Sequence, residues 1–410
     1  MRRPTTSPRM NEKPLLSADL VVILSGITAA LHVGKLPTAL PLLRDALGIT
    51  LLQAGFLLSL VQVAGMSLGL LLGLAADSLG LRRSLLAGLS ILAAASALGG
   101  WARDATDLLW LRAAEGLGFL LVSLPAPSLI RQLVPPGQLS LRLGLWGAYM
   151  PLGTALALLC GPWVMAALDW RGWWWGLAAV SAGMALLAAR RVPSDAARRH
   201  AAAARPAGES QAWLHRLRQT LAASGPWLVA LTFAMYSGQW LAVIGFLPSV
   251  YDQAGVSGTL AGALTAFAAL CNVAGNVGSG RLVHRGVRPQ LLLHAAFAAM
   301  ALGTFIAFAL PEEQAVLRYL GVLMFSGFGG MIPATLFMLA VRFAPGEQTV
   351  STTVGWVQQF ASLGQFAGAP LVAWVAGQVG GWQWTWAVTG AACLVGVLLV
   401  GRMPLKPVGK

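Results

Sequence analysis

The stretch "GLAADSLGLRRSLL", residues 73–86, holds all the charged residues found between positions 46 and 102. Apolar runs lie on either side of it, at about 51–76 and 83–101. Each run is long enough to cross the hydrocarbon core of a bilayer, which takes roughly 20 apolar residues in a helix. A short charged turn between two such runs predicts a pair of membrane-spanning helices that meet at one face of the membrane.

The rest of the chain repeats this pattern of apolar runs separated by short polar breaks. Of its 410 residues 57% are hydrophobic and only 10% are charged, and the mean hydropathy is +0.70. This composition excludes a water-soluble enzyme of several domains. We therefore predict an all-α membrane protein that lies in a lipid bilayer. Twelve transmembrane helices are predicted, at 20–42, 51–76, 83–101, 107–130, 141–168, 172–189, 225–250, 258–280, 290–310, 315–341, 349–377 and 383–401.

The net charge of +14 comes from Lys and Arg residues that fall mostly on one side of the predicted membrane. Of the 28 Lys and Arg, 22 lie in the two termini, the central loop and the other loops of that side. The opposite loops hold only Arg44, Arg103 and Arg171. Because Lys and Arg are retained on the cytoplasmic side, we predict a multi-pass protein of a bacterial cytoplasmic (inner) membrane with both termini cytoplasmic. The basic excess then reports topology and requires no nucleic-acid partner.

A polar, basic segment divides the predicted helices into six and six. It contains the Pro, Gly and Ser of a linker, followed by "QAWLHRLRQTL" at 211–221, which predicts an amphipathic helix at the membrane surface. The predicted organisation is a cytoplasmic tail at 1–19, a six-helix bundle at 20–190, a cytoplasmic linker at 191–224, a second six-helix bundle at 225–402 and a cytoplasmic tail at 403–410.

The two halves are similar in sequence. Arg112 in "WLRAAEGLGFLLVSLPAPS" aligns with Arg318 in "VLRYLGVLMFSGFGGMIPA", and the same offset brings Pro127 onto Pro333. With six helices in each half, the two repeats have the same orientation, so a pseudo-twofold axis along the membrane normal is predicted. The space between the halves is then the expected place for a solute.

Together these features resemble the major facilitator superfamily over nearly the whole chain. The loop after the second helix fits that family's Gly-x-x-x-Asp-x-x-Gly-x-Arg motif, except that Leu81 stands where the family often has a basic residue. Its matching residues are Gly73, Asp77, Gly80, Arg82 and Arg83. The resemblance implies a secondary transporter that works by alternating access, in which this loop closes the inward gate and does not bind solute. Arg112, Gly116 and Gly118 match the Arg-x-x-x-Gly-x-Gly pattern that the family associates with proton coupling.

The clear intramembrane ionisable residues are four, namely His32, Lys35, Arg112 and Glu115. A charge in the bilayer core costs about 2.5 kcal/mol or more, so such residues are the best functional candidates. At about 1.5 Å per residue, Lys35 and Arg112 share a level about 8 Å from the outer face, and His32 and Glu115 share one about 12 Å deep. We expect the four either to face a cavity between the halves, or to form an internal Arg112–Glu115 pair with Lys35 reaching outward.

A cavity lined in this way holds more positive than negative charge, which favours an anionic solute. Its predicted substrate-binding residues are Lys35, Arg112, Tyr236, Gln239 and Trp240. His32 or Glu115 would carry the coupling proton, because each changes charge when its surroundings change. The predicted function is proton-coupled uptake of a small organic or inorganic anion, by a monomer.

Other functions are less compatible with the sequence. The three cysteines are isolated in apolar runs, and no Met, Cys or His pair has the spacing of a soft-metal site, so neither a metal nor a cofactor is predicted. An enzyme would need a nucleophile with a base, or a metal cluster, at bilayer level. Proton-driven export of an amphipathic compound or drug is the alternative, although Val164–Ala167 replace the paired glycines of many drug exporters.

Overall fold

The computed structural model describes residues 17–70, 80–135, 138, 142, 145–196, 213–346 and 349–404, and these ranges contain helices and no strand. The first half holds α1 (Ala18–Leu47), α2 (Leu51–Ser59), the 3-10 turn η1 (Leu60–Gln62), α4 (Leu81–Gly99), α5 (Ala105–Ser123), α6 (Ala126–Leu133) and α8 (Tyr149–Arg191). The second half holds α10 (Trp213–Ala222), α11 (Ser224–Gln253), α12 (Gly258–His284), α13 (Pro289–Ala309), the 3-10 turn η2 (Glu312–Gln314), α14 (Ala315–Gly329), α15 (Met331–Arg342), α16 (Val350–Val379) and α17 (Thr385–Gly401).

The described helices account for all twelve predicted spans. Ten segments are long and apolar enough to cross a membrane, and the shorter apolar helix α17 adds another. The twelfth comes from α8, which is interrupted at Asp169, where φ is 63° and ψ is 172°. Both parts of α8 pass the same stretch of α1, because Gly153 approaches Ala30 and Ser181 contacts His32. The chain therefore reverses at Asp169, and the all-α fold with twelve spans is confirmed.

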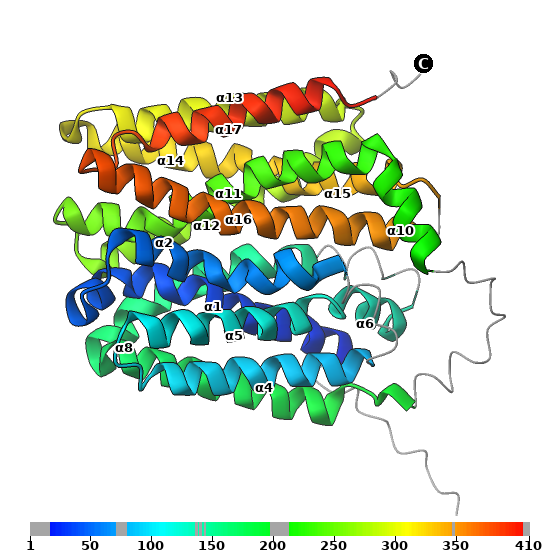
Figure 1. Ribbon diagram of the computed structural model, residues 1–410, viewed down its shortest axis with the longest axis horizontal. Coiled ribbons are helices and arrows are strands. Elements are labelled where there is room, and N and C mark those ends of the chain that lie inside the picture. Colours follow the sequence, from blue (N-terminus) through cyan, green and yellow to red (C-terminus); the bar gives the residue numbers. More distant parts are fainter. Residues whose placement is uncertain are drawn as a thin grey trace, which may run out of the picture.

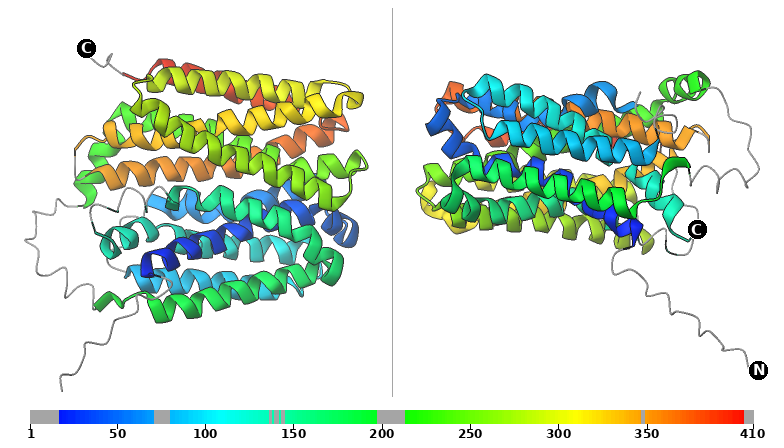
Figure 2. Two further views of the ribbon diagram at one scale, coloured as in Figure 1. Left: turned by 180° about the vertical axis from the view of Figure 1, so that it is seen from behind. Right: turned by 90° about the horizontal axis from the view of Figure 1, so that it is seen from below.

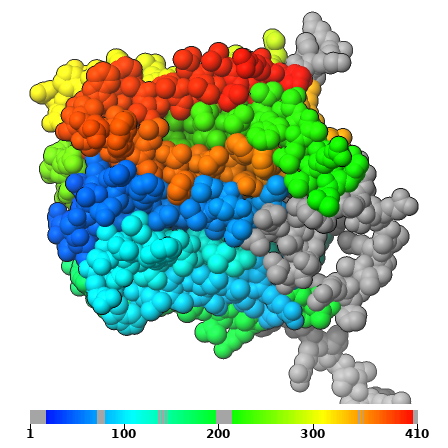
Figure 3. Space-filling model, viewed as in Figure 1, coloured from blue at the N-terminus to red at the C-terminus, as the bar shows by residue number. Residues whose placement is uncertain are grey.

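The two halves lie side by side with their helices roughly parallel (Figure 1, and from behind in Figure 2). The chain begins α1 and ends α17 at the same end of the bundle, which also carries α10, as predicted for residues 211–221. We call this the inner end, after the cytoplasmic side predicted for the termini, and the opposite end the outer end. Across the boundary between the halves α2 packs on α16, α8 on α12 and α1 on α11. Figure 3 shows α2 in blue directly beside α16 in orange.

Equivalent helices pack in the same way in both halves. In the first half α4 meets α5 at Gly88 and Gly118, where an added Cβ on Gly88 would lie 2.6 Å from the Gly118 carbonyl oxygen. In the second half α13 meets α14 at Gly303 and Gly321 with the same 2.6 Å separation. Small residues let helix backbones approach closely in a membrane. The repeated glycine contact agrees with the predicted pseudo-twofold relation between the halves.

The tightest helix contact provides a test of the fold. A Cβ on Gly275 of α12 would lie 1.9 Å from the carbonyl oxygen of Gly327 in α14. Because backbone cannot move aside as a side chain can, we expect Gly275→Ala to lower the free energy of unfolding by about 1–3 kcal/mol. Thermal unfolding in detergent measures the effect. Gly278→Ala on the same helix is the matched control, since its Cβ meets nothing within 4 Å. Equal stability of the two variants would contradict the close approach.

Candidate functional site

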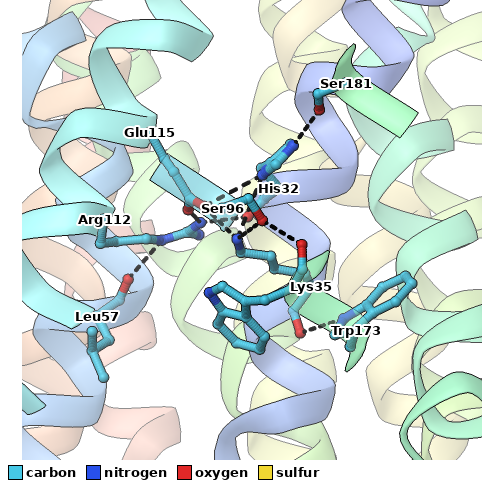
Figure 4. Close-up of polar contacts among 9 residues, drawn as sticks. His32, Lys35, Leu57, Ser96, Arg112, Glu115, Trp173 and Ser181 are labelled. Atoms are coloured by element: carbon cyan, nitrogen blue, oxygen red, sulfur yellow. Dashed lines mark hydrogen bonds and ion pairs between the residues drawn. The ribbon is translucent and has the colours of Figure 1, made fainter. Parts of the chain in front are cut away.

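The four intramembrane candidates His32, Lys35, Arg112 and Glu115 come together inside the first half, as Figure 4 shows. Lys35 and His32 of α1 are 0% exposed, and Arg112 and Glu115 of α5 are 3% and 2% exposed. Charged side chains are almost never buried this completely unless they are paired. Here the pairing partner is shared, because the single carboxylate of Glu115 contacts all three basic residues.

Lys35 spans the space between α1 and α5 to reach Glu115. Its Nζ forms an ion pair with Oε1 of Glu115 and donates a hydrogen bond to Ser96 Oγ of α4 at 3.1 Å. The same ammonium group lies 4.5 Å from the ring centre of Trp174, close enough for a cation–π interaction. Lys35 is therefore held by one carboxylate, one hydroxyl group and one aromatic face, and it is fully buried.

His32 connects the carboxylate to the second part of α8. Its Nε2 lies 2.8 Å from Ser181 Oγ, and its Nδ1 lies 3.4 Å from Glu115 Oε1 and 3.5 Å from Lys35 Nζ. A neutral His32 can use Nδ1 to accept from Lys35, whereas a protonated His32 must donate from Nδ1, and the acceptor in reach is Glu115. Proton binding at His32 would therefore change the hydrogen-bond partner of its Nδ1 from Lys35 to Glu115.

Arg112 ties α5 to both α1 and α2. Its NH1 group donates to Glu115 Oε2 at 2.8 Å and to the backbone carbonyl of His32, while Nε donates to the Leu57 carbonyl at 3.0 Å. Two prolines inside α1, Pro37 and Pro41, lack the amide hydrogen that a helix needs and loosen it just beyond the site. The Arg112 NH2 group has no hydrogen-bond partner in the described part of the chain.

The cluster carries an excess of positive charge. Lys35 and Arg112 are two cations against the one carboxylate of Glu115, so one positive charge is left over when His32 is neutral. Protonation of His32 or of Glu115 makes the excess larger. An unbalanced charge in a low-dielectric interior is costly, and an approaching anion lowers that cost.

The sequence predicted this cluster in part. The depth estimate that put Lys35 and Arg112 on one level, with His32 and Glu115 on the next, agrees with their mutual contacts. The predicted direction differs, because Lys35 and His32 turn into the first half toward Ser96 and Ser181 and not toward a cavity between the halves. The Arg112–Glu115 pair of the alternative interpretation exists, but Lys35 is buried beside it and does not reach outward.

The second-half candidates Tyr236, Gln239 and Trp240 all lie on α11. The Tyr236 hydroxyl accepts from Asn272 Nδ2 at 2.9 Å, and Gln239 donates to the Met235 carbonyl at 2.7 Å. Trp240 is 5% exposed, and its Nε1 has no hydrogen-bond partner among the described residues. In those same residues no hydrogen bond or ion pair joins these three side chains to the charged cluster of the first half.

The predicted gating loop is described only in its second part, because Gly73 and Asp77 lie outside the described residues. Gly80 has φ 86° and directly precedes α4, and a Cβ there would lie 2.7 Å from an Asp195 oxygen. The Asp195 carboxylate accepts from the amides of Arg82 at 3.0 Å and Arg83 at 3.2 Å. A carboxylate at a helix N-terminus is favourable. The chain just after α8 is thus bound to the start of α4 within one half.

Three supporting residues were missed by sequence reasoning, namely Ser96, Ser181 and Trp174. The two serines are 0% exposed and each bonds to one of the buried bases. In the sequence, each of these two serines is a polar residue inside an apolar run. Many other serines in the predicted spans have the same surroundings, so this feature did not single them out. Trp174 belongs to the tryptophan-rich turn at 170–175 and gave no sign that it would contact a cation.

Comparison with protein families identifies a close match. The sequence profile of the Major Facilitator Superfamily matches residues 20–353, most of the chain. The cyanate transport protein CynX of Escherichia coli is 25% identical over 393 residues, which cover 93% of this chain and 95% of that protein. The puromycin resistance protein pur8 of Streptomyces alboniger is 33% identical over 182 residues, but these cover 44% of this chain and 35% of pur8.

Solved structures share the fold. The D-xylose-proton symporter superposes with a TM-score of 0.74 at 16% identity, over 96% of this chain and 98% of that one. A bacterial homolog of the human lysosomal transporter Spinster, in an inward-facing and unoccupied conformation, gives a TM-score of 0.72 at 15% identity, over 94% of each chain. At such low identity these likenesses establish the architecture and carry no information on the solute.

Proposed function

This chain belongs to the Major Facilitator Superfamily, and on that basis we propose that it takes up a small anion together with a proton. Its relatives and structural neighbours are membrane transporters, so the chain is a secondary transporter and not an enzyme. Our proposal concerns the solute that it carries, the direction of transport and the coupling ion. The excess of Lys and Arg in the termini and central loop supports a cytoplasmic membrane with both termini inside.

The observation that carries the proposal is the single carboxylate shared by two buried cations. Glu115 pairs with Lys35 and Arg112, and the described residues provide no further carboxylate in the cluster. At an effective dielectric constant near 20 and a distance of roughly 5 Å, one uncompensated positive charge attracts a monovalent anion by about 3 kcal/mol. That attraction corresponds to about a hundredfold in affinity. A neutral or cationic solute gains nothing from it.

The same cluster supports coupling to protons. A proton bound at His32 or Glu115 adds one positive charge, which strengthens the attraction for an anion. Because coupling between two binding sites is reciprocal, the bound anion in turn strengthens proton binding. The proton and the anion therefore load together and leave together, which is the requirement for symport. Tyr236, Gln239 and Trp240 would contact the solute from the second half as the halves rock.

The relative that aligns over nearly its whole length supports an anion. CynX is named a cyanate transport protein, and cyanate is a small monovalent anion. The charge excess of the cluster fits a solute of that size and charge. We take small monovalent anions, cyanate first among them, as the substrate class to be tested.

The proposal is tested by transport into proteoliposomes that contain the purified protein. With an inside-alkaline pH gradient, labelled cyanate, another small inorganic anion or a small carboxylate should accumulate, and dissipating the gradient should stop accumulation. Protein-free vesicles and a labelled neutral sugar are the controls. If no anion of the panel accumulates, or if the neutral sugar accumulates equally, anion uptake is the wrong function.

Drug export is the second candidate, since pur8 is named a puromycin resistance protein. The sequence identity to pur8 is higher than that to CynX, but the alignment with pur8 covers less than half of this chain. If the protein exports drugs, cells that lack the gene should become sensitive to puromycin and should accumulate amphipathic dyes. Anion uptake predicts unchanged drug sensitivity in the same cells, so one strain separates the two functions.

Alternating access requires contacts between the halves to break, and Gln359 of α16 makes such contacts. Its side-chain amide donates to the Met66 carbonyl at 2.8 Å and accepts from the Leu70 amide at 3.2 Å, both in the second span. We expect Gln359→Leu to open the inner end more readily, because both hydrogen bonds are lost. The modification rate of Ser362→Cys by a water-soluble thiol reagent, in a cysteine-free background, should rise several-fold.

The neighbouring residue supplies the control for this change. Gln358 is also half-buried on α16, but no hydrogen bond of its side chain occurs in the described residues. Gln358→Leu should therefore leave the modification rate unchanged. An unchanged rate in Gln359→Leu as well would remove Gln359 from the contact that holds the halves together.

A further inference from the structure

A small cavity lies beside the charged cluster, within the first half of the molecule. Its volume is about 10 Å³, close to the space that one water molecule needs. Every residue that lines it comes from α1, α2, α5 or α8, and the second half contributes none. The lining consists of Leu36, Leu57, Leu108, Leu111, Arg112, Glu115 and Trp174.

The cavity contains the polar groups that a bound water requires. Arg112 is 3% exposed, and of its three guanidinium nitrogens only NH2 has no hydrogen-bond partner in the described residues. A buried donor without a partner costs about 1–3 kcal/mol, and a water molecule removes that cost. Glu115 lines the same cavity and provides the acceptor oxygens. One donor group and one carboxylate are the minimum that holds a buried water in place.

The position of the cavity indicates what this water could do. Leu108 lies about one helical turn from Ala105, where α5 begins at the outer end, so only a short apolar stretch separates the cavity from the outer face. The charged groups that face Glu115 are His32 and Lys35 from α1 and Arg112 from its own helix. The solute, in contrast, is expected to move between the two halves.

We infer that this cavity is a water site through which Glu115 exchanges its proton with the outer side, by a route inside the first half that is separate from the solute's. The inference rests on the proposed proton coupling. A hydronium ion that reaches the site gives one proton to a Glu115 oxygen, which leaves a neutral carboxylic acid and a neutral water. The reverse transfer returns the proton. Leu108 and Leu111 then act as the apolar barrier that water must cross.

The test is to fill the cavity and to measure two transport reactions in proteoliposomes. Leu111→Phe adds volume at the cavity wall and leaves every charged residue in place. We expect the initial rate of pH-driven anion uptake to fall at least tenfold. Exchange of labelled for unlabelled anion at equal pH should stay within twofold of wild type, because exchange requires no net release of protons.

Two further variants make the result decisive. Leu109→Phe, on the adjacent face of α5 and outside the cavity lining, should leave both reactions unchanged. Leu111→Ala enlarges the cavity and should raise the rate of pH-driven uptake, so the inference is still tested if Leu111→Phe folds poorly. Equal loss of both reactions in Leu111→Phe, or no loss of either, overturns the inference. Failure of the wild type to accumulate any anion with a pH gradient would instead overturn the proposed function.

Discussion

Glu115→Gln should abolish pH-driven accumulation of the anion and should also destabilise the protein. The neutral amide cannot balance Lys35 and Arg112, so two buried cations remain without a counter-charge. Removing one partner of a buried ion pair typically costs about 3–5 kcal/mol. The variant also resembles a permanently protonated Glu115, so anion exchange at equal pH should continue in the molecules that fold. Uptake and exchange in proteoliposomes, with thermal unfolding in parallel, measure these effects.

A double variant separates the structural effect from the loss of coupling. Lys35→Met combined with Glu115→Gln removes one cation along with the carboxylate, so the cluster again carries one excess positive charge when His32 is neutral. We expect the double variant to recover much of the stability lost in Glu115→Gln, and to remain unable to use the pH gradient. Accumulation at the wild-type level in Glu115→Gln would exclude Glu115 as the proton carrier.

The composition and spacing of the sequence were sufficient to predict the fold and the identity of the clustered residues. The cost of a charge in hydrocarbon makes His32, Lys35, Arg112 and Glu115 conspicuous well inside runs that are otherwise apolar. The constant rise of a helix then places them at matching depths. Both arguments use physical quantities that depend on the chain alone, which is why they could be made before any contact was known.

The side toward which His32 and Lys35 point could not be predicted in the same way. A spacing of three and four residues puts Thr28, His32 and Lys35 on one face of α1, but it does not say which neighbour that face meets. The neighbours are set by close packing, for example where Gly34 of α1 lies against the backbone of Thr154 in α8. Such contacts depend on the shapes of both helices.

The break in α8 was predicted, but its form was not. The sequence predicts a break between the spans at 141–168 and 172–189, and the structure reverses the chain there at a single residue of positive φ, Asp169. Residues other than glycine rarely adopt a positive φ with an extended ψ, so the spacing of the apolar runs gives no sign of it. The Asp169 carboxylate accepts from the amide of Trp170. A sequence pattern locates such a turn but does not give its length.

Lys35→Met should weaken binding of the anion by about a hundredfold while leaving the protein folded. Arg112 and Glu115 remain as one cation and one carboxylate at 2.8 Å, so no charge is left unbalanced when His32 is neutral. Met keeps most of the volume of the buried Lys stem. The variant loses the ion pair with Glu115, the cation–π contact with Trp174 and the hydrogen bond to Ser96, but the Glu115 carboxylate stays paired with Arg112. The concentration of anion that gives half-maximal uptake measures the change.

The size of this effect follows from the charge that is removed. A positive charge at roughly 5 Å from an anion contributes about 3 kcal/mol at an effective dielectric constant near 20. Arg318→Met is the matched control, because Arg318 is a half-buried cation that donates to the Ala307 carbonyl in the second half and has no contact with Glu115. A general effect of net charge would weaken uptake equally in both variants. If Lys35→Met binds the anion as tightly as the wild type, the excess charge of the cluster does not attract the solute.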